Sequence, residues 1–180
     1  MSDFAEELNK LHFLTGADFI AQLKMIVARG EFHLLQGETA IYSVGGEQSE
    51  DYRNLLNAAK KAVELGYRVF ILPNPQGIRT ADFIFEQRGI FKMFDLKTIQ
   101  GRASAANRLL ESVGQTKHVL LNIRCSYEAR VLAADIKQYF ESYGEAQEVL
   151  VLKGRKTISV KRQWSESPDF FATFRRQYEK

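Results

Sequence analysis

The sequence predicts an α/β (α+β) fold with a central mixed β-sheet, flanked by helices, and a small helical and hairpin appendage at the N-terminus. Three observations support this prediction. Between residues 50 and 123 the apolar patterns follow the order helix, strand, strand, strand, helix, strand. Short apolar runs such as residues 67–72 and 118–123 are typical of buried strands. The stretches between them have apolar residues at helical spacing, so helices are available to cover the sheet.

The N-terminal appendage is predicted from three patterns. Residues 3–12 and 17–29 carry apolar side chains at near-helical spacing, which predicts two short amphipathic helices. Residues 31–44 have the pattern of a hairpin, because two apolar runs flank Gln36-Gly37. Gly45-Gly46 then marks a joint with the rest of the chain.

The first element of the central order is a helix that begins after Ser49 and ends at Gly66. Ser49 supplies a capping hydroxyl, the acids that follow it suit the helix dipole, and the glycine provides a stop. The strand over residues 67–72 ends at Pro73. The segment from Pro73 to Gly77 is predicted to be a loop, because its prolines and glycine interrupt regular pairing.

The later elements are predicted from the same signals, namely apolar periodicity bounded by glycine, serine or proline. They are strands over 81–86, 90–98 and 118–123, a helix from Arg102 to Val113, a helix capped by Ser126 that runs to Tyr143, a hairpin of strands 148–153 and 156–161, and a terminal helix opened by Ser167-Pro168. The predicted domain organisation is an appendage over residues 1–46, a core over residues 47–163 and a C-terminal helix over residues 164–180.

The composition is that of one globular domain with a small addition, since 45% of the 180 residues are hydrophobic and 26% are charged. Cys125 is the only cysteine, so an intramolecular disulfide is excluded and a reducing, cytoplasmic location is expected. No apolar run approaches the roughly 18 residues of a membrane-spanning helix, and the acidic start lacks the pattern of a secretory signal. We therefore expect no membrane partner.

Charge is unevenly distributed along the chain, although the net charge is only +3. Residues 1–51 carry nine acidic and three basic side chains, whereas residues 151–180 carry eight basic and three acidic ones. The basic end permits a nucleic-acid partner, DNA or RNA, and the acidic N-terminal region is a candidate docking surface for a protein partner. Solvated faces are the alternative for both ends, because most charge runs are of that kind.

The hairpin of residues 81–98 contains the most informative constellation. If Arg88-Gly89 is a two-residue turn, the numbers of paired residues sum to 177, and Asp82 lies directly opposite Asp95. Opposed Cβ atoms are about 5 Å apart, a distance at which two carboxylates repel each other. Strand alternation places Lys97 on the same face as Asp95.

A divalent cation removes the repulsion between two opposed carboxylates. Mg²⁺ or Mn²⁺ suits such a site, because these ions prefer oxygen ligands and Mg²⁺ commonly binds substrate phosphates. The chemistry indicated is attack of water on a phosphodiester, with Asp82 and Asp95 as metal ligands and Lys97 assisting the water. This metal site is a hypothesis, and there are two structural alternatives to it. In the first, Asp95 and Lys97 simply neutralise each other on a solvated face. In the second, the turn has three residues, which moves Asp82 to the other face of the sheet from Asp95.

Asp82 together with Asp95-Leu96-Lys97 resembles the signature of the PD-(D/E)xK restriction-endonuclease-like superfamily. The predicted order of helix, three strands, helix and strand is similar to the core of that superfamily. The resemblance implies that Asp82 and Asp95 hold the metal, and that Lys97 assists catalysis. It also implies a further acid from the first helix, for which Glu64 and Asp51 are candidates. The chain departs from the pattern at Ala81, where the family has proline.

Residues 94–123 resemble a second group, the nuclease modules of bacterial polymorphic and contact-dependent inhibition toxins and the barnase–EndoU–colicin–RelE-like nuclease domains. The segments that carry this resemblance are Phe94-Asp-Leu-Lys-Thr-Ile, Gly101-Arg-Ala-Ser, Gly114-Gln-Thr-Lys-His and Val119-Leu-Leu-Asn-Ile. It implies metal-free RNA cleavage by acid–base chemistry, in which a cation stabilises the transition state and a histidine moves protons. The implied site residues are Lys97, Thr98, Arg102, Ser104 and His118. A strand-end histidine without a catalytic role is the alternative for His118.

Arg102 and Gln115 are also candidates for substrate binding. Arg102 follows the loop that begins after Thr98, and Gln115 precedes the last core strand. A surface role is the alternative for each. The sequence therefore predicts a metal-dependent nuclease, with a metal-independent toxin-like RNA nuclease as one alternative and a non-catalytic binding or accessory protein of a mobile element or phage as another.

Overall fold

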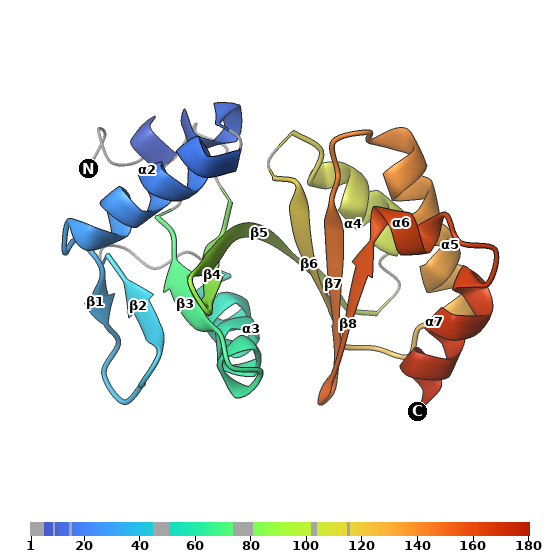
Figure 1. The fold of residues 1–180 in the computed structure, drawn as a ribbon. Helices are drawn as coiled ribbons and strands as arrows, with labels where there is room; N and C mark the ends of the chain where they lie inside the picture. The colour runs from blue at the N-terminus through green and yellow to red at the C-terminus, as the bar shows by residue number, and fades with distance from the viewer. Residues whose placement is uncertain are drawn as a thin grey trace. The chain divides into compact units, whose positions relative to one another are not determined.

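The computed structural model describes residues 6–8, 10–14, 16–44, 51–73, 81–101, 104–114 and 116–180 (Figure 1). The chain divides into two compact units, Met1–Phe94 and Asp95–Lys180. The elements of the first unit are η1 (Leu11–Phe13), α2 (Gly16–Ala28), β1 (His33–Leu34), β2 (Ile41–Ser43), α3 (Tyr52–Glu64), β3 (Arg68–Ile71), β4 (Phe83–Gln87) and the first half of β5 (Ile90–Ile99). The second unit contains the rest of β5, α4 (Ala105–Glu111), β6 (His118–Ile123), α5 (Ala129–Ser142), β7 (Glu148–Lys153), β8 (Lys156–Lys161), α6 (Arg162–Ser165) and α7 (Phe170–Glu179).

The strands form a mixed sheet, as the sequence predicts. In the described part of the chain, hydrogen-bonded neighbours follow the order β1-β2-β3-β4-β5-β6-β7-β8. The pairs β2–β3, β5–β6 and β6–β7 are parallel, and the other pairs are antiparallel. The central order of α3, β3, β4, β5, α4 and β6 is the predicted order of helix, three strands, helix and strand. The predicted fold class is therefore confirmed.

The turn between β4 and β5 has the predicted length. Arg88 and Gly89 both have positive φ angles, 52° and 79°, as a two-residue type I′ turn requires. The register runs from Gln87↔Ile90 to Phe83↔Phe94, so the numbers of paired residues sum to 177. The three-residue turn considered as an alternative is wrong.

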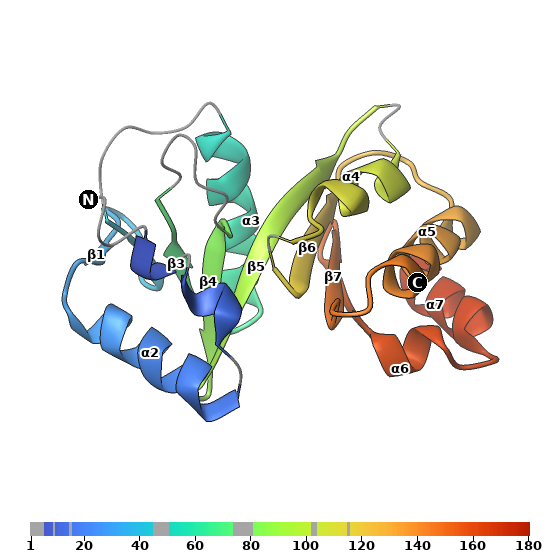
Figure 2. The same ribbon diagram turned by 90° about the horizontal axis from the view of Figure 1, so that it is seen from above.

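The first unit is a sheet with a helix on each side. Figure 2 shows α2 and α3 on opposite sides of β3 and β4. The inner face of α3 is formed by Leu55, Ala58, Ala59 and Ala62, all buried. The small alanine side chains let the helix approach the strands closely. On the other side, Leu23 and Ile26 of α2 belong to a core cluster with residues of β3, β4 and β5, namely Phe70, Ile84, Phe91 and Met93.

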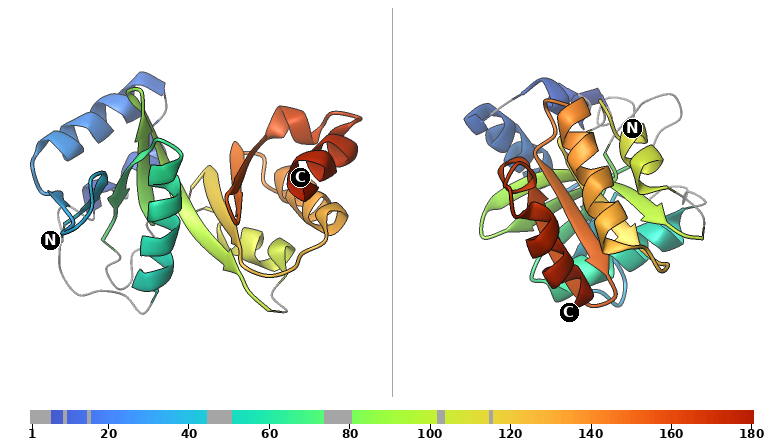
Figure 3. Two further views of the ribbon diagram at one scale, coloured as in Figure 1. Left: turned by 90° about the horizontal axis from the view of Figure 1, so that it is seen from below. Right: turned by 90° about the vertical axis from the view of Figure 1, so that its right-hand side faces the viewer.

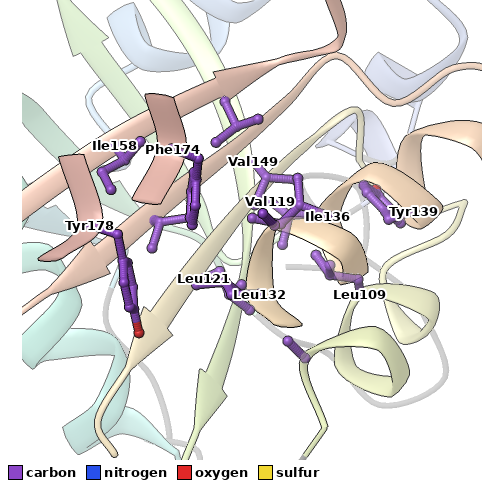
Figure 4. Close-up of a cluster of buried hydrophobic side chains, with 14 of the residues drawn as sticks. Leu109, Val119, Leu121, Leu132, Ile136, Tyr139, Val149, Ile158, Phe174 and Tyr178 are labelled. Carbon is purple, nitrogen blue, oxygen red and sulfur yellow. The ribbon is translucent and has the colours of Figure 1, made fainter. Parts of the chain in front are cut away.

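The second unit covers one face of its strands with helices. Figure 3, right, shows α5 and α7 side by side over the strands. Strand alternation directs the odd-numbered residues of β6 and β7 into this core, and buried helix side chains meet them there. Figure 4 shows members of the cluster, among them Leu109, Val119, Leu121, Leu132, Ile136, Tyr139, Val149, Ile158, Phe174 and Tyr178.

Four predicted helix starts are wrong. The helix predicted to begin after Ser49 begins at Tyr52 with Asp51 as its N-cap, and the helix predicted from Arg102 begins at Ala105 with Ser104 as its N-cap.

The helix after β6 begins at Ala129 and its N-cap is Glu128, not Ser126. The backbone at Tyr127 is held by a tertiary contact, since its carbonyl accepts a hydrogen bond of 2.8 Å from the Tyr178 hydroxyl. The terminal helix begins at Phe170 after the N-cap Asp169, so Pro168 does not open it.

The predicted cap Ser49 lies outside the described residues, as do the Gly45-Gly46 joint and residues 74–80. The predicted core over residues 47–163 contains parts of both units. The end of the chain, residues 164–180, packs into the core of the second unit through Phe170, Phe174 and Tyr178. The domain boundaries at 46/47 and 163/164 stay a prediction. No described helix is long and apolar enough to cross a membrane.

Candidate active site

An ion pair between a buried aspartate and a partly exposed lysine lies on β5 in the second unit. Asp95 is only 3% exposed. Its Oδ2 atom lies 3.3 Å from the Nζ atom of Lys97. In the register with β6, Asp95 pairs with Val119 and Lys97 with Leu121. Both residues are therefore on the face that carries the core helices, as strand alternation predicts. A buried carboxylate requires such a partner, because an unpaired charge away from water is costly.

A third side chain joins this pair from the end of α4. The hydroxyl of Ser112 donates a hydrogen bond of 2.7 Å to Asp95 Oδ2. Ser112 is the C-cap residue of α4 and is fully buried. Sequence reasoning did not identify Ser112. Its signal is weak, because a serine at the end of a helix is common at surfaces.

A tyrosine of α5 contributes to the electrostatics of the same region. Tyr139 is 2% exposed, and no described group forms a hydrogen bond with its hydroxyl. Burial raises the pKa of Tyr139, and the nearby Tyr143 hydroxyl and Asp95 carboxylate raise it further. The Tyr139 hydroxyl therefore stays protonated at neutral pH.

The predicted second carboxylate belongs to the first unit. Asp82 precedes β4, where its backbone N–H donates to Phe94 O over 3.0 Å and its carbonyl accepts from Leu72 N over 2.9 Å. The confirmed register ends at Phe83↔Phe94, one residue short of the predicted partners Asp82 and Asp95. Asp95 belongs to the second unit. The predicted metal site formed by these two carboxylates stays a prediction.

Three other predicted residues are described. Thr98 pairs with Asn122 in the register of β5 and β6, so it faces away from the core helices. Ser104 is the N-cap of α4, and its Oγ atom accepts a hydrogen bond of 3.5 Å from Asn107 N. His118 is the first residue of β6, and Leu121, which pairs with Lys97, lies three positions further along that strand. Because strand side chains alternate between faces, His118 and Lys97 lie on opposite faces of the sheet. Thr98 lies four residues along the sheet from His118, a separation of about 13 Å.

Arg102 and Gln115 lie outside the described residues. The two acids suggested for the first helix are at its ends, Asp51 as the N-cap and Glu64 as the last residue of α3. The basic hairpin tip packs on the terminal helix. Lys153 Nζ lies 3.8 Å from the centre of the Tyr178 ring, and Lys156 Nζ donates to Tyr178 O over 3.1 Å.

His118 has partners that sequence reasoning missed. Its Nδ1 atom lies 3.2 Å from Glu148 Oε1. The other carboxylate oxygen, Oε2, accepts a hydrogen bond of 2.5 Å from the hydroxyl of Ser159. Glu148 is 4% exposed. His118, Glu148 and Ser159 come from three neighbouring strands, and this set is called the histidine cluster. Only the tertiary pairing of β6, β7 and β8 brings its members together.

The chemistry of these side chains limits how a metal ion is held. Among the described residues, no three His, Cys, Asp or Glu side chains gather closely enough to hold a metal ion. Mg²⁺ usually keeps several waters and is bound by one or two carboxylates together with substrate phosphates. The Asp95 carboxylate is a ligand of that kind, and it already accepts from Ser112 and lies beside Lys97.

Comparison with known proteins adds little to this description. No protein-family model matches the chain. No curated protein matches it either. One solved structure that resembles it is the CdiA-CT/CdiI toxin and immunity complex from Burkholderia pseudomallei, with 15% identity and a TM-score of 0.42. The match covers 66% of this chain and 98% of that chain. A likeness of this degree assigns no activity.

Proposed function

We propose that this protein is a nuclease that hydrolyses phosphodiester bonds at Asp95 and Lys97 with the help of Mg²⁺ or Mn²⁺. The observation that supports this proposal is the ion pair between the buried Asp95 and the partly exposed Lys97, whose Oδ2 and Nζ atoms are 3.3 Å apart. A carboxylate and an ammonium group at this distance provide a ligand for a cation and a positive charge beside it. The order of elements that carries them is the one implied by the PD-(D/E)xK resemblance.

Each residue has a defined role in this proposal. The Asp95 carboxylate holds the cation, and the hydrogen bond from Ser112 fixes its orientation. The Lys97 ammonium group orients the attacking water and stabilises the charge that develops on the phosphoryl oxygens. The cation, when bound, polarises the phosphoryl oxygen and lowers the pKa of water. Asp82 is the predicted second ligand.

The proposal is tested by incubating the full chain with tRNA, single-stranded DNA and duplex DNA, each in Mg²⁺, Mn²⁺ or EDTA. We expect cleavage of at least one substrate with either cation and none in EDTA. The Asp95→Asn variant should lose this cleavage, whereas Glu141→Gln, which changes an exposed carboxylate of α5, should retain it. Absence of cleavage in all conditions favours the non-catalytic alternative.

The histidine cluster favours a second candidate function, metal-independent cleavage of RNA. A buried carboxylate that holds one nitrogen of a histidine orients the ring for proton transfer. Glu148 occupies that position, with Ser159 fixing its second oxygen. Lys161, which is exposed and directly opposite Glu148 in the register, places a cation at the same edge for a phosphate.

The two functions are separated by EDTA and by two substitutions. Cleavage of RNA that persists in EDTA and is lost in His118→Gln supports the histidine cluster. Cleavage that requires the cation and is lost in Asp95→Asn supports the ion pair on β5. The two sites are on opposite faces of the sheet, so neither substitution removes a contact of the other site.

A further inference from the structure

The turn between β7 and β8 brings two lysines face to face. Lys153↔Lys156 is the last pair of the register before the turn formed by Gly154 and Arg155. Gly154 has a φ angle of 58°, as the first central residue of a type II′ turn requires. The two lysine side chains therefore lie on one face of the sheet with their Cβ atoms about 5 Å apart, an arrangement in which like charges destabilise the strand pair.

Both lysines are held against one aromatic residue. Lys153 Nζ lies 3.8 Å from the centre of the Tyr178 ring, and Lys156 Nζ donates to Tyr178 O over 3.1 Å. The face of a ring and a carbonyl at a helix end carry only partial negative charge. Among the residues that the structure describes, no carboxylate forms an ion pair with either ammonium group. Two full positive charges are thus gathered at Tyr178, and each ammonium group has three donors with which to bind an anion.

Two arginines extend this positive charge along the same edge of the sheet. Arg155 is exposed in the turn, and Arg124 is exposed directly after Ile123, the partner of Lys153 on β6. In Figure 1 the β7–β8 turn and the C-terminal end of α7 lie at the same end of the second unit. Arg124, Lys153, Arg155 and Lys156 are called the basic edge. They span three neighbouring strands, a width of about 10 Å.

The basic edge is close to the proposed reaction site. Arg124 N donates a hydrogen bond of 2.9 Å to the carbonyl of Ile99, the last residue of β5. Lys97 is two residues before Ile99 on the same strand, a separation of about 7 Å. Successive nucleotides of one strand in a duplex advance by about 3.4 Å. Arg124 is therefore about two nucleotides from Lys97.

We infer that the basic edge binds the phosphate backbone of the nucleic acid that is cleaved at Asp95 and Lys97. A phosphate bound between Lys153 and Lys156 removes the repulsion between them, because opposite charges then alternate. A free phosphate ion would occupy the lysine pair alone, whereas a polynucleotide carries its charges in a row that also reaches the arginines. The inference rests on the proposed function, since it names the surface that holds the substrate.

The test removes the lysine charges in the double variant Lys153→Gln/Lys156→Gln. Binding of the full chain to a short fluorescein-labelled single-stranded RNA, and to DNA of the same sequence, is measured in EDTA by fluorescence anisotropy at several salt concentrations. We expect the slope of log Kd against log salt concentration to fall by about 1.4, since each phosphate contact in a single strand contributes about 0.7. Kd at low salt should rise on the order of 10-fold, equally for RNA and DNA.

The matched control is Lys24→Gln/Arg53→Gln, which removes the same charge from exposed positions of α2 and α3 and should retain the wild-type slope. Arg155→Gln changes an exposed turn residue with little consequence for folding, and should lower the slope by about 0.7. Absence of binding by wild type, a wild-type slope in both basic-edge variants, or an equal fall in the control overturns the inference. A fall for only one of the two nucleic acids also contradicts recognition through phosphates.

Failure of this inference is distinguishable from failure of the proposed function. Wild type that cleaves in Mg²⁺, with binding that does not depend on Lys153, Lys156 or Arg155, shows that only the basic edge is wrong. Wild type that binds through these residues and leaves the probe intact in Mg²⁺ and Mn²⁺ supports the basic edge and contradicts the nuclease.

Discussion

Ser112 Oγ lies 2.7 Å from Asp95 Oδ2 and donates to it a hydrogen bond that is buried from solvent. This bond connects the end of α4 to the middle of β5. It also satisfies one oxygen of a carboxylate that has little access to water. The charge of Asp95 is thus stabilised by Ser112 and Lys97 together.

Ser112→Ala is expected to lower the free energy of unfolding by about 1–3 kcal/mol, because it leaves a buried charged acceptor without its donor. Urea unfolding followed by circular dichroism measures this change. Ser142→Ala, at an exposed position of α5, is the control and should stay within about 0.5 kcal/mol of wild type. Equal stability of the two variants would show that the buried hydrogen bond contributes nothing.

Arg162 satisfies the carbonyl groups at the end of α5. Its guanidinium donates to Phe140 O and Tyr143 O, both over 2.6 Å, and to Ala146 O over 2.8 Å. Arg162→Ala is expected to reduce the free energy of unfolding by about 3 kcal/mol, because several carbonyls lose a charged donor. Arg162→Lys should restore less than half of this loss, since an ammonium group cannot reproduce the planar fork.

The control for Arg162 is Arg175→Ala, which breaks the exposed pair with Glu179. That pair joins positions four apart on one helix and should contribute about 0.3–0.5 kcal/mol. Thermal unfolding of both variants provides the comparison. A loss in Arg162→Ala no larger than that in Arg175→Ala would contradict the role of the guanidinium.

The histidine cluster predicts a coupling energy between Glu148 and Ser159. Ser159→Ala, Glu148→Gln and the double variant form a thermodynamic cycle, in which residues that contact each other couple by about 0.5–3 kcal/mol. The predicted coupling is favourable, because the Ser159 hydroxyl donates to Glu148 Oε2. Additive losses in urea unfolding would indicate that the bond is not formed in solution.

The raised pKa of Tyr178 predicts that the protein loses stability at high pH. Burial raises the pKa of Tyr178 to about 12, above the ordinary value of about 10. The folded state therefore retains a proton that the unfolded chain has lost, so the free energy of unfolding is unaffected below about pH 10 and falls between pH 10 and 12. Denaturation measured over this range should show a smaller fall in Tyr178→Phe, and equal slopes would exclude the effect.

The backbone arrangement around the site was predictable because it depends on local signals. Arg88-Gly89 fixes the turn, the turn fixes the register of β4 and β5, and alternation then places Asp95 and Lys97 on one face. Ser112 was not predictable, since its hydrogen bond to Asp95 comes from where the end of α4 lies against β5. A serine at a helix end is an ordinary feature of a sequence.

The helix starts failed for a similar reason. Ser126 has the chemistry of a cap. The carbonyl of the next residue, Tyr127, however accepts a hydrogen bond from the hydroxyl of Tyr178, 51 positions later in the chain. A contact over that distance leaves no local signal. Glu148 was likewise seen only as the first residue of a strand, and its contact with His118 follows from the register of β6 and β7.

Hydrolysis of phosphodiester bonds at Asp95 and Lys97 is tested most directly by the initial rate of Mg²⁺-dependent nucleic-acid cleavage. The rate is measured for wild type, Asp95→Asn, Lys97→Met and the exposed control Lys24→Met. We expect Asp95→Asn and Lys97→Met to lose a factor of about 10² or more, while Lys24→Met cleaves at the wild-type rate. Wild-type rates in Asp95→Asn and Lys97→Met, or no cleavage by wild type, would contradict hydrolysis at these two residues.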